Sequence, residues 1–109
     1  MTEYLCDTLG NGLRVVSVPM PYHHSAEVLV YLGVGSRHEN PHKAGVSHFL
    51  EHMLFKGTQE YPTGLNLERA FEAIGGSANA ATDSETTCFH SRIHPDHIAR
   101  GIALFASMM

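Results

Sequence analysis

Residues 44–58 read AGVSHFLEHMLFKGT, and this stretch holds the most distinctive pattern of the 109-residue chain. At about 100° per residue, apolar side chains at positions i, i+3, i+4, i+7 and i+8 form one stripe, which predicts an amphipathic helix. The stripe consists of Val46, Phe49, Leu50, Met53 and Leu54. Lys56 followed by Gly57 is typical of a helix end.

Two histidines and a carboxylate, His48, Glu51 and His52, lie together on the other side of this helix. Imidazoles four residues apart lie one turn above each other, so both can bind one divalent metal at about 2.0–2.1 Å. A carboxylate beside the metal can take a proton from an attacking water and pass it to the departing amine of an amide. The pattern therefore predicts His48 and His52 as metal ligands and Glu51 as general base, against the simpler alternative of a solvated helix face.

Two blocks of the sequence carry a family resemblance. The first joins GSRHE at residues 35–39 to GVSHFLEHMLFKGT at residues 45–58, and the second is GGSANAAT at residues 75–82. Both resemble the pitrilysin (M16) zinc metallopeptidases, the family with the inverted HxxEH signature that includes insulin-degrading enzyme and the mitochondrial processing peptidases. The resemblance implies a zinc endopeptidase for peptides or small unfolded proteins, with one Zn²⁺ per complete active site. It also implies that Asn79 and Ala80 bind the substrate.

The same resemblance implies that these residues lack one metal ligand. In the family the third ligand is a glutamate on a later helix, roughly seventy to eighty residues after the motif, which falls beyond Met109. The chain ends in Met108-Met109 with no glycine, proline or polar cap, as if cut inside a helix. We therefore expect residues 1–109 to be the N-terminal part of a single M16-type peptidase domain, inactive alone and with exposed apolar surface.

Two other functions stay open from the sequence. A non-catalytic family member would bind peptides or a partner as a subunit without completing its metal site, and the missing third ligand favours this reading. A metal-dependent lyase similar to S-ribosylhomocysteinase would use a similar inverted motif, but its small polar substrate would not need the alanine-rich segment at residues 77–83.

Extended segments make up much of the remaining chain. Residues 4–9 and 13–20 flank a Gly-Asn-Gly sequence, which predicts a hairpin. Alternating patterns predict strands over residues 26–34 and 85–93. The small side chains of residues 77–83 suit an edge strand, where an extended peptide can add itself to the sheet through main-chain hydrogen bonds.

Two further helices follow from apolar residues at helical spacing. One is predicted over residues 65–74 with Asn66 as a possible cap. The other opens at Pro95 and is predicted to have an apolar side made by Ile98, Ile102, Phe105 and Met109. With the resemblance, these elements predict a two-layer α+β fold, an antiparallel or mixed sheet with helices largely on one face, similar to the pitrilysin and processing-peptidase metallohydrolase domain.

The loop ahead of the motif helix contains polar side chains with open roles. His38 and His42 are expected to be surface residues rather than ligands. Arg37 and Glu39 either pair with each other or brace the loop, and the sequence does not choose between these alternatives.

Composition limits the partners. The net charge is −4, and 7 Lys and Arg are spread without a cluster, which gives no footprint for nucleic acid or an anionic membrane. Cys6 and Cys88 are expected to be free thiols. No signal or transit peptide is visible, so a cytoplasmic location is expected. The expected partner is a peptide substrate, and a homodimer or a heterodimer with a related subunit stays open.

Overall fold

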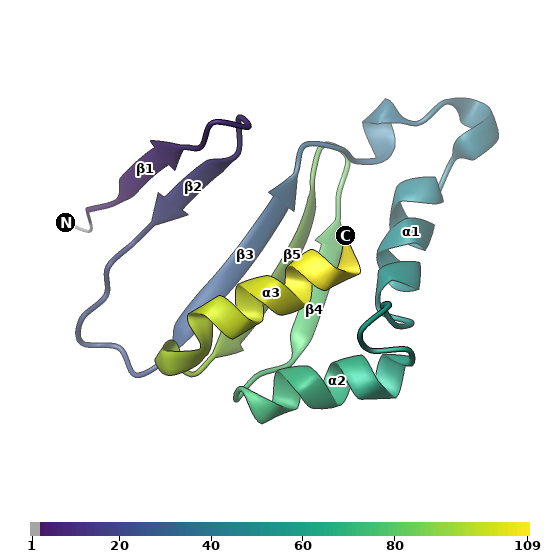
Figure 1. Cartoon of the computed structure of the whole chain (residues 1–109). Coiled ribbons are helices and arrows are strands. Elements are labelled where there is room, and N and C mark those ends of the chain that lie inside the picture. Colours follow the sequence, from purple (N-terminus) through teal and green to yellow (C-terminus); the bar gives the residue numbers. More distant parts are fainter. Residues whose placement is uncertain (1–2) are drawn as a thin grey trace.

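The computed structural model describes residues 3–109 and shows strands and helices in an α+β arrangement, which confirms the predicted fold class (Figure 1). The strands are β1 Leu5–Thr8, β2 Arg14–Ser17, β3 Ala26–Leu32, β4 Ala78–Thr82 and β5 Thr87–Ile93. The helices are α1 Val46–Leu54, α2 Gly64–Ala73 and α3 Ile98–Met108, with short 3₁₀ turns at Ser36–His38, Pro41–Lys43 and Pro95–His97.

The N-terminal hairpin forms as predicted. β1 and β2 pair antiparallel, with Leu5 opposite Ser17 and Thr8 opposite Arg14. These two strands form a sheet of their own, separate from the sheet that contains β3 (Figure 1). All their residues are exposed, so the hairpin adds nothing to the core of the described chain.

The second sheet has the order β3-β5-β4 and is antiparallel throughout. Along the central strand β5, every second residue is buried, from Thr87 to Ile93, so one face of the sheet belongs to the core. Val28 and Val30 of β3 lie on the same face and pack against that core. β4 lies at the edge of the sheet, as predicted for the alanine-rich segment.

Helix α3 lies across the buried face of the sheet (Figure 1). Its contact point is Gly101, where an added Cβ would come within 2.7 Å of Cδ1 of Ile93. Of the predicted apolar side, Phe105 is buried as expected, but the prediction was wrong for Ile98, Ile102 and Met109, which are exposed. The buried side is formed by Gly101, Leu104, Phe105 and Met108. This helix is apolar on most sides, so periodicity could not identify the side on which a glycine permits the closest approach.

Helix α2 forms close to the predicted range, packs beside α3 and completes the core with the buried side chains of Leu67 and Phe71. Its cap is Thr63 rather than Asn66, because the Thr63 hydroxyl accepts the backbone N–H of Asn66 at 3.1 Å. Gly75, with φ of +94°, ends the helix.

Two further findings concern the cysteines and the length of the helices. Cys6 and Cys88 are both free, as predicted. Among the described residues, no helix is long and apolar enough to cross a membrane.

Candidate metal centre

Helix α1 forms over the predicted residues and packs against the edge strand β4. Its orientation differs from that of an ordinary amphipathic helix. Four members of the apolar stripe, Val46, Phe49, Leu50 and Met53, are exposed, and Leu54 alone of the five packs against the core. Glu51, on the polar side, is only 8% exposed. Glu51 thus points into the molecule, whereas His48 and His52 on the same side of the helix are exposed.

The three predicted site residues of α1 come together in space. Ligand atoms of His48, Glu51 and His52 all lie within 4.8 Å of one another. The Nε2 atoms of the two histidines are 2.9 Å apart, and their ring centroids are 4.5 Å apart. The helical spacing therefore produces the convergence that the sequence predicts.

This donor set fits a zinc ion. Two nitrogens bound to zinc at tetrahedral angles are roughly 3.3–3.4 Å apart, so the observed 2.9 Å requires only a small opening of the imidazoles. A hydrogen bond between two ring nitrogens needs one of them unprotonated, and the unprotonated form is also the one that binds a metal. The residues present can supply two nitrogen ligands and a neighbouring carboxylate.

Glu51 has a partner that the sequence analysis did not identify. The hydroxyl of Thr82, the last residue of β4, donates a hydrogen bond to Oε2 of Glu51. Alternation along the strand gave the available signal: Thr82 lies on the same face as Ala78 and Ala80, which is the face turned toward the helices. A hydroxyl there can reach a carboxylate on a helix that packs against β4.

The two predicted substrate-binding residues differ in position. Ala80 lines the same hollow as His48 and Glu51, whereas Asn79 is exposed on the opposite face of β4. The hollow is formed by the start of α1, the loop before it and the end of β4. Its lining consists of Ser36, Glu39, Gly45, His48, Glu51, Ala80, Ala81, Thr82, Asp83 and Ser84.

Glu39 braces the start of α1, which decides one alternative left open by the sequence. Its carboxylate accepts the backbone N–H of Gly45 at 2.9 Å and that of Ser47 at 2.6 Å. Gly45 has φ of +89°, a conformation that favours glycine and lets the chain turn into the helix. Arg37 pairs with Glu85 instead. Glu39 therefore holds the helix end that directly precedes His48.

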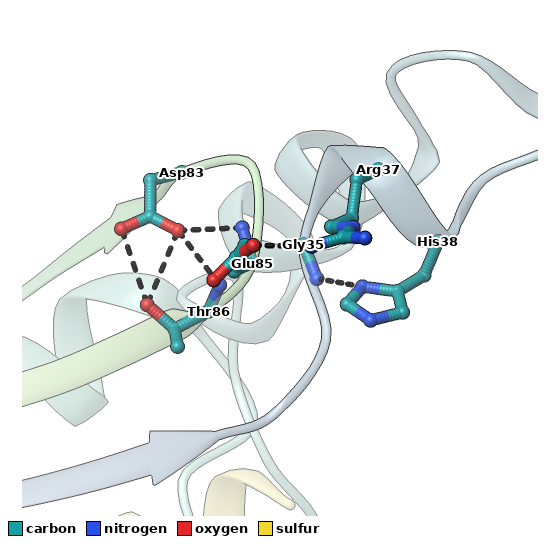
Figure 2. A network of polar contacts seen from close by, with 6 residues as sticks. All are labelled: Gly35, Arg37, His38, Asp83, Glu85 and Thr86. Carbon is teal, nitrogen blue, oxygen red and sulfur yellow. Dashed lines mark hydrogen bonds and ion pairs between the residues drawn. The ribbon is translucent and has the colours of Figure 1, made fainter.

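The loop before α1 is fastened to the turn between β4 and β5 (Figure 2). Backbone N–H groups of Ser36 and Arg37 donate to the carbonyl oxygens of Asp83 and Ser84 at 3.0 and 2.8 Å. At Gly35 an added Cβ would lie 2.4 Å from the Asp83 carbonyl oxygen, so this approach requires glycine. These contacts fix the loop that leads into α1 relative to the end of β4.

The carboxylate of Asp83 holds this turn from within (Figure 2). It accepts the backbone N–H groups of Glu85 at 2.8 Å and Thr86 at 2.7 Å. On the loop side, the N–H of Gly35 donates to Nδ1 of His38 at 3.1 Å. His38 therefore has a local structural role, consistent with its predicted exclusion from the metal ligands.

Acid should weaken this part of the fold. The backbone N–H groups of Ser47 and Gly45 hold the pKa of Glu39 below its ordinary value, and those of Thr86 and Glu85 do the same for the pKa of Asp83. A lowered folded-state pKa gives stability that is complete above the unfolded value of about 4 and is lost as pH falls through the folded value.

We therefore expect the urea midpoint to fall as pH is lowered from 6 to 3, and to fall less steeply in Glu39→Gln. Gln keeps an acceptor oxygen but loses the charge whose protonation is coupled to unfolding. Glu72→Gln, on the exposed side of α2, is the control for charge removal alone. Parallel pH dependences in Glu39→Gln and the parent would contradict this account of the cap.

Fold and site together define an α+β domain with a candidate metal centre between a helix and an edge strand. The family model described as Insulinase (Peptidase family M16) matches residues 14–109. The chain therefore belongs to peptidase family M16, as the sequence resemblance implied.

Individual relatives agree with this assignment. An uncharacterized zinc protease of Bacillus subtilis, YmxG, is 40% identical over 106 residues, covering 97% of this chain and 25% of the relative. An uncharacterized zinc protease of Rickettsia bellii is 40% identical over 101 residues, covering 93% of this chain and 24% of the relative. The crystal structure of a protease from Helicobacter pylori matches with a TM-score of 0.92 and 35% identity, covering 100% of this chain and 26% of that chain. The chain thus spans about a quarter of the length of these relatives.

Proposed function

We propose that this chain contributes the catalytic helix and the substrate-binding strand of a zinc endopeptidase that cleaves peptides or small unfolded proteins. The observation that carries the proposal is the convergence of His48, Glu51 and His52 beside the edge strand β4. Membership of family M16 and relatives named zinc proteases support it.

Each side chain has a chemical role in this proposal. His48 and His52 would hold the zinc, which when bound supplies a Lewis acid that polarises the scissile carbonyl and activates water. Glu51 accepts a proton from the attacking water and then donates it to the departing amine. Its burial and its bond to Thr82 keep the carboxylate next to the two imidazoles.

The edge strand β4 supplies the binding surface. Because β5 occupies only one side of β4, an extended peptide could pair with the other side through main-chain hydrogen bonds. Ala80, which lines the hollow, and Asn79 are the positions where we place the substrate backbone. The peptide bond to be cleaved would then lie beside α1.

We place the third protein ligand outside the described residues. A catalytic zinc usually has three protein ligands and one open position. Within residues 3–109, no further histidine, cysteine or carboxylate joins the group formed by His48, Glu51 and His52. The ligand, which we propose is a glutamate, would come from a longer form of the protein or from a partner chain.

The alternative is a non-catalytic subunit that binds peptides at the edge strand β4. Cleavage of quenched fluorescent peptides by the full-length protein distinguishes the two functions. We expect cleavage to stop after treatment with 1,10-phenanthroline and to return when about one equivalent of Zn²⁺ per active site is added. Peptide binding without cleavage would favour the subunit, and cleavage that survives removal of the metal would contradict the zinc mechanism.

A further inference from the structure

We infer that Thr82 is the positioning residue for Glu51: its hydroxyl holds one carboxylate oxygen so that the other is presented to water. The inference rests on the proposed function for its catalytic consequence. The positioning itself can be tested without any catalysis.

The contact joins two elements that are far apart in the sequence. Thr82 ends β4, and Glu51 lies in the middle of α1. The Thr82 hydroxyl donates to Oε2 of Glu51, and among the described residues it is the one side-chain donor to this carboxylate. Because Glu51 is only 8% exposed, water cannot readily replace this donor.

The hydrogen bond restricts rotation of the Glu51 side chain, and a general base must be held in one position to act on the attacking water. A glutamate has several rotatable bonds, and a misplaced base can lose much of its effect on the reaction rate. With Oε2 occupied by the Thr82 proton, Oε1 is the oxygen free to accept a proton from water. A hydrogen bond to an ionised carboxylate is also stronger than one between neutral groups.

Contacts of the neighbouring turn and of the adjacent strand fix the backbone at Thr82. The residue after it, Asp83, fixes the following turn through the N–H groups of Glu85 and Thr86. Across the ladder, the backbone of Thr82 is paired with that of Thr87 in the central strand β5. The Thr82 hydroxyl is thus presented from a fixed backbone, as a positioning contact requires.

Strand propensity alone does not account for a hydroxyl at this position. Valine is close to threonine in shape and also favours strands, so a purely structural residue could be either. Thr82→Val therefore removes the donor with little change in volume, and Thr82→Ser restores the donor on a smaller side chain. Thr87→Val is the matched control, because it removes a neighbouring hydroxyl that bonds to the backbone of Val34 and not to Glu51.

The first measurement is steady-state peptide cleavage by the full-length zinc enzyme. We expect Thr82→Val to lower kcat by roughly ten- to a hundred-fold with little change in KM or zinc content. Thr82→Ser should recover most of the rate. Parental kcat in Thr82→Val, no recovery in Thr82→Ser, or an equal loss in Thr87→Val would overturn the inference.

The second measurement uses the zinc-free protein and needs no activity. Side-chain scalar couplings measured by NMR report whether Glu51 occupies one rotamer or averages over several. We expect one rotamer in the parent and in Thr82→Ser, and averaging in Thr82→Val. If the parent cleaves no peptide but shows this pattern, the proposed function fails while the positioning role of Thr82 stands. A single Glu51 rotamer in Thr82→Val would overturn the positioning role.

Discussion

Replacement of Glu51 by glutamine in the full-length protein is expected to leave zinc bound and to reduce kcat/KM by roughly 10²–10⁴-fold. Glutamine preserves the shape of the side chain and keeps an oxygen that can accept the Thr82 hydroxyl. It cannot take up a proton from water. The substitution therefore removes general-base chemistry while leaving His48 and His52 in place.

Two measurements on the same samples test this prediction: peptide cleavage rates, and zinc content by atomic emission spectroscopy. Glu68→Gln, an exposed glutamate on α2, serves as the matched control and should cleave at the parental rate. Cleavage by Glu51→Gln at the parental rate would refute the assignment of Glu51 as the base. Loss of zinc together with activity would show instead that Glu51 supports the metal.

The sequence predicted the secondary structure well because the local signals were strong. The Gly-Asn-Gly turn, the alternation along β5 and the helical spacing in α1 each have a direct physical cause. The candidate site was equally readable, because positions 48, 51 and 52 share one side of any helix that contains them. Local periodicity therefore fixed the relation between these three side chains before any tertiary structure was considered.

Periodicity could not predict which side of a helix meets the rest of the molecule. In α1 the apolar stripe is largely exposed, and Glu51 faces β4. In α3 the contact occurs at Gly101, the one residue without a side chain on a helix that is apolar nearly all round. Both orientations depend on tertiary packing, which a single helix does not encode. The exposed stripe of α1 and the exposed β1–β2 hairpin also agree with the expectation of uncovered apolar surface.

Long-range polar contacts were the other part that the sequence did not predict. The cap provided by Glu39 crosses six to eight residues, and the bond from Thr82 to Glu51 crosses thirty-one. Neither has a periodic signature. The bond from Thr82 to Glu51 forms where the loop before α1 is fastened to the turn after β4, whereas the Glu39 cap forms within the segment that leads into α1.

Replacement of His52 by alanine should remove the metal, and with it the activity. A single imidazole binds zinc more weakly than two imidazoles do. Loss of an outer-shell partner alone typically lowers metal affinity 10–100-fold, so loss of a direct ligand should lower it by more than about 100-fold. His48→Ala should behave in the same way, since the two Nε2 atoms face each other across 2.9 Å.

Competition with a fluorescent zinc chelator measures this affinity directly, with His42→Ala as the control. His42 is an exposed histidine in the loop before α1 and is not part of the group formed by His48, Glu51 and His52. Parental affinity in His52→Ala, or an equal loss in His42→Ala, would place the metal elsewhere. The two site variants would then separate the roles on one helix: Glu51→Gln keeps zinc without cleavage, whereas His52→Ala keeps neither. That difference is expected only if the imidazoles bind the metal and the carboxylate moves the proton.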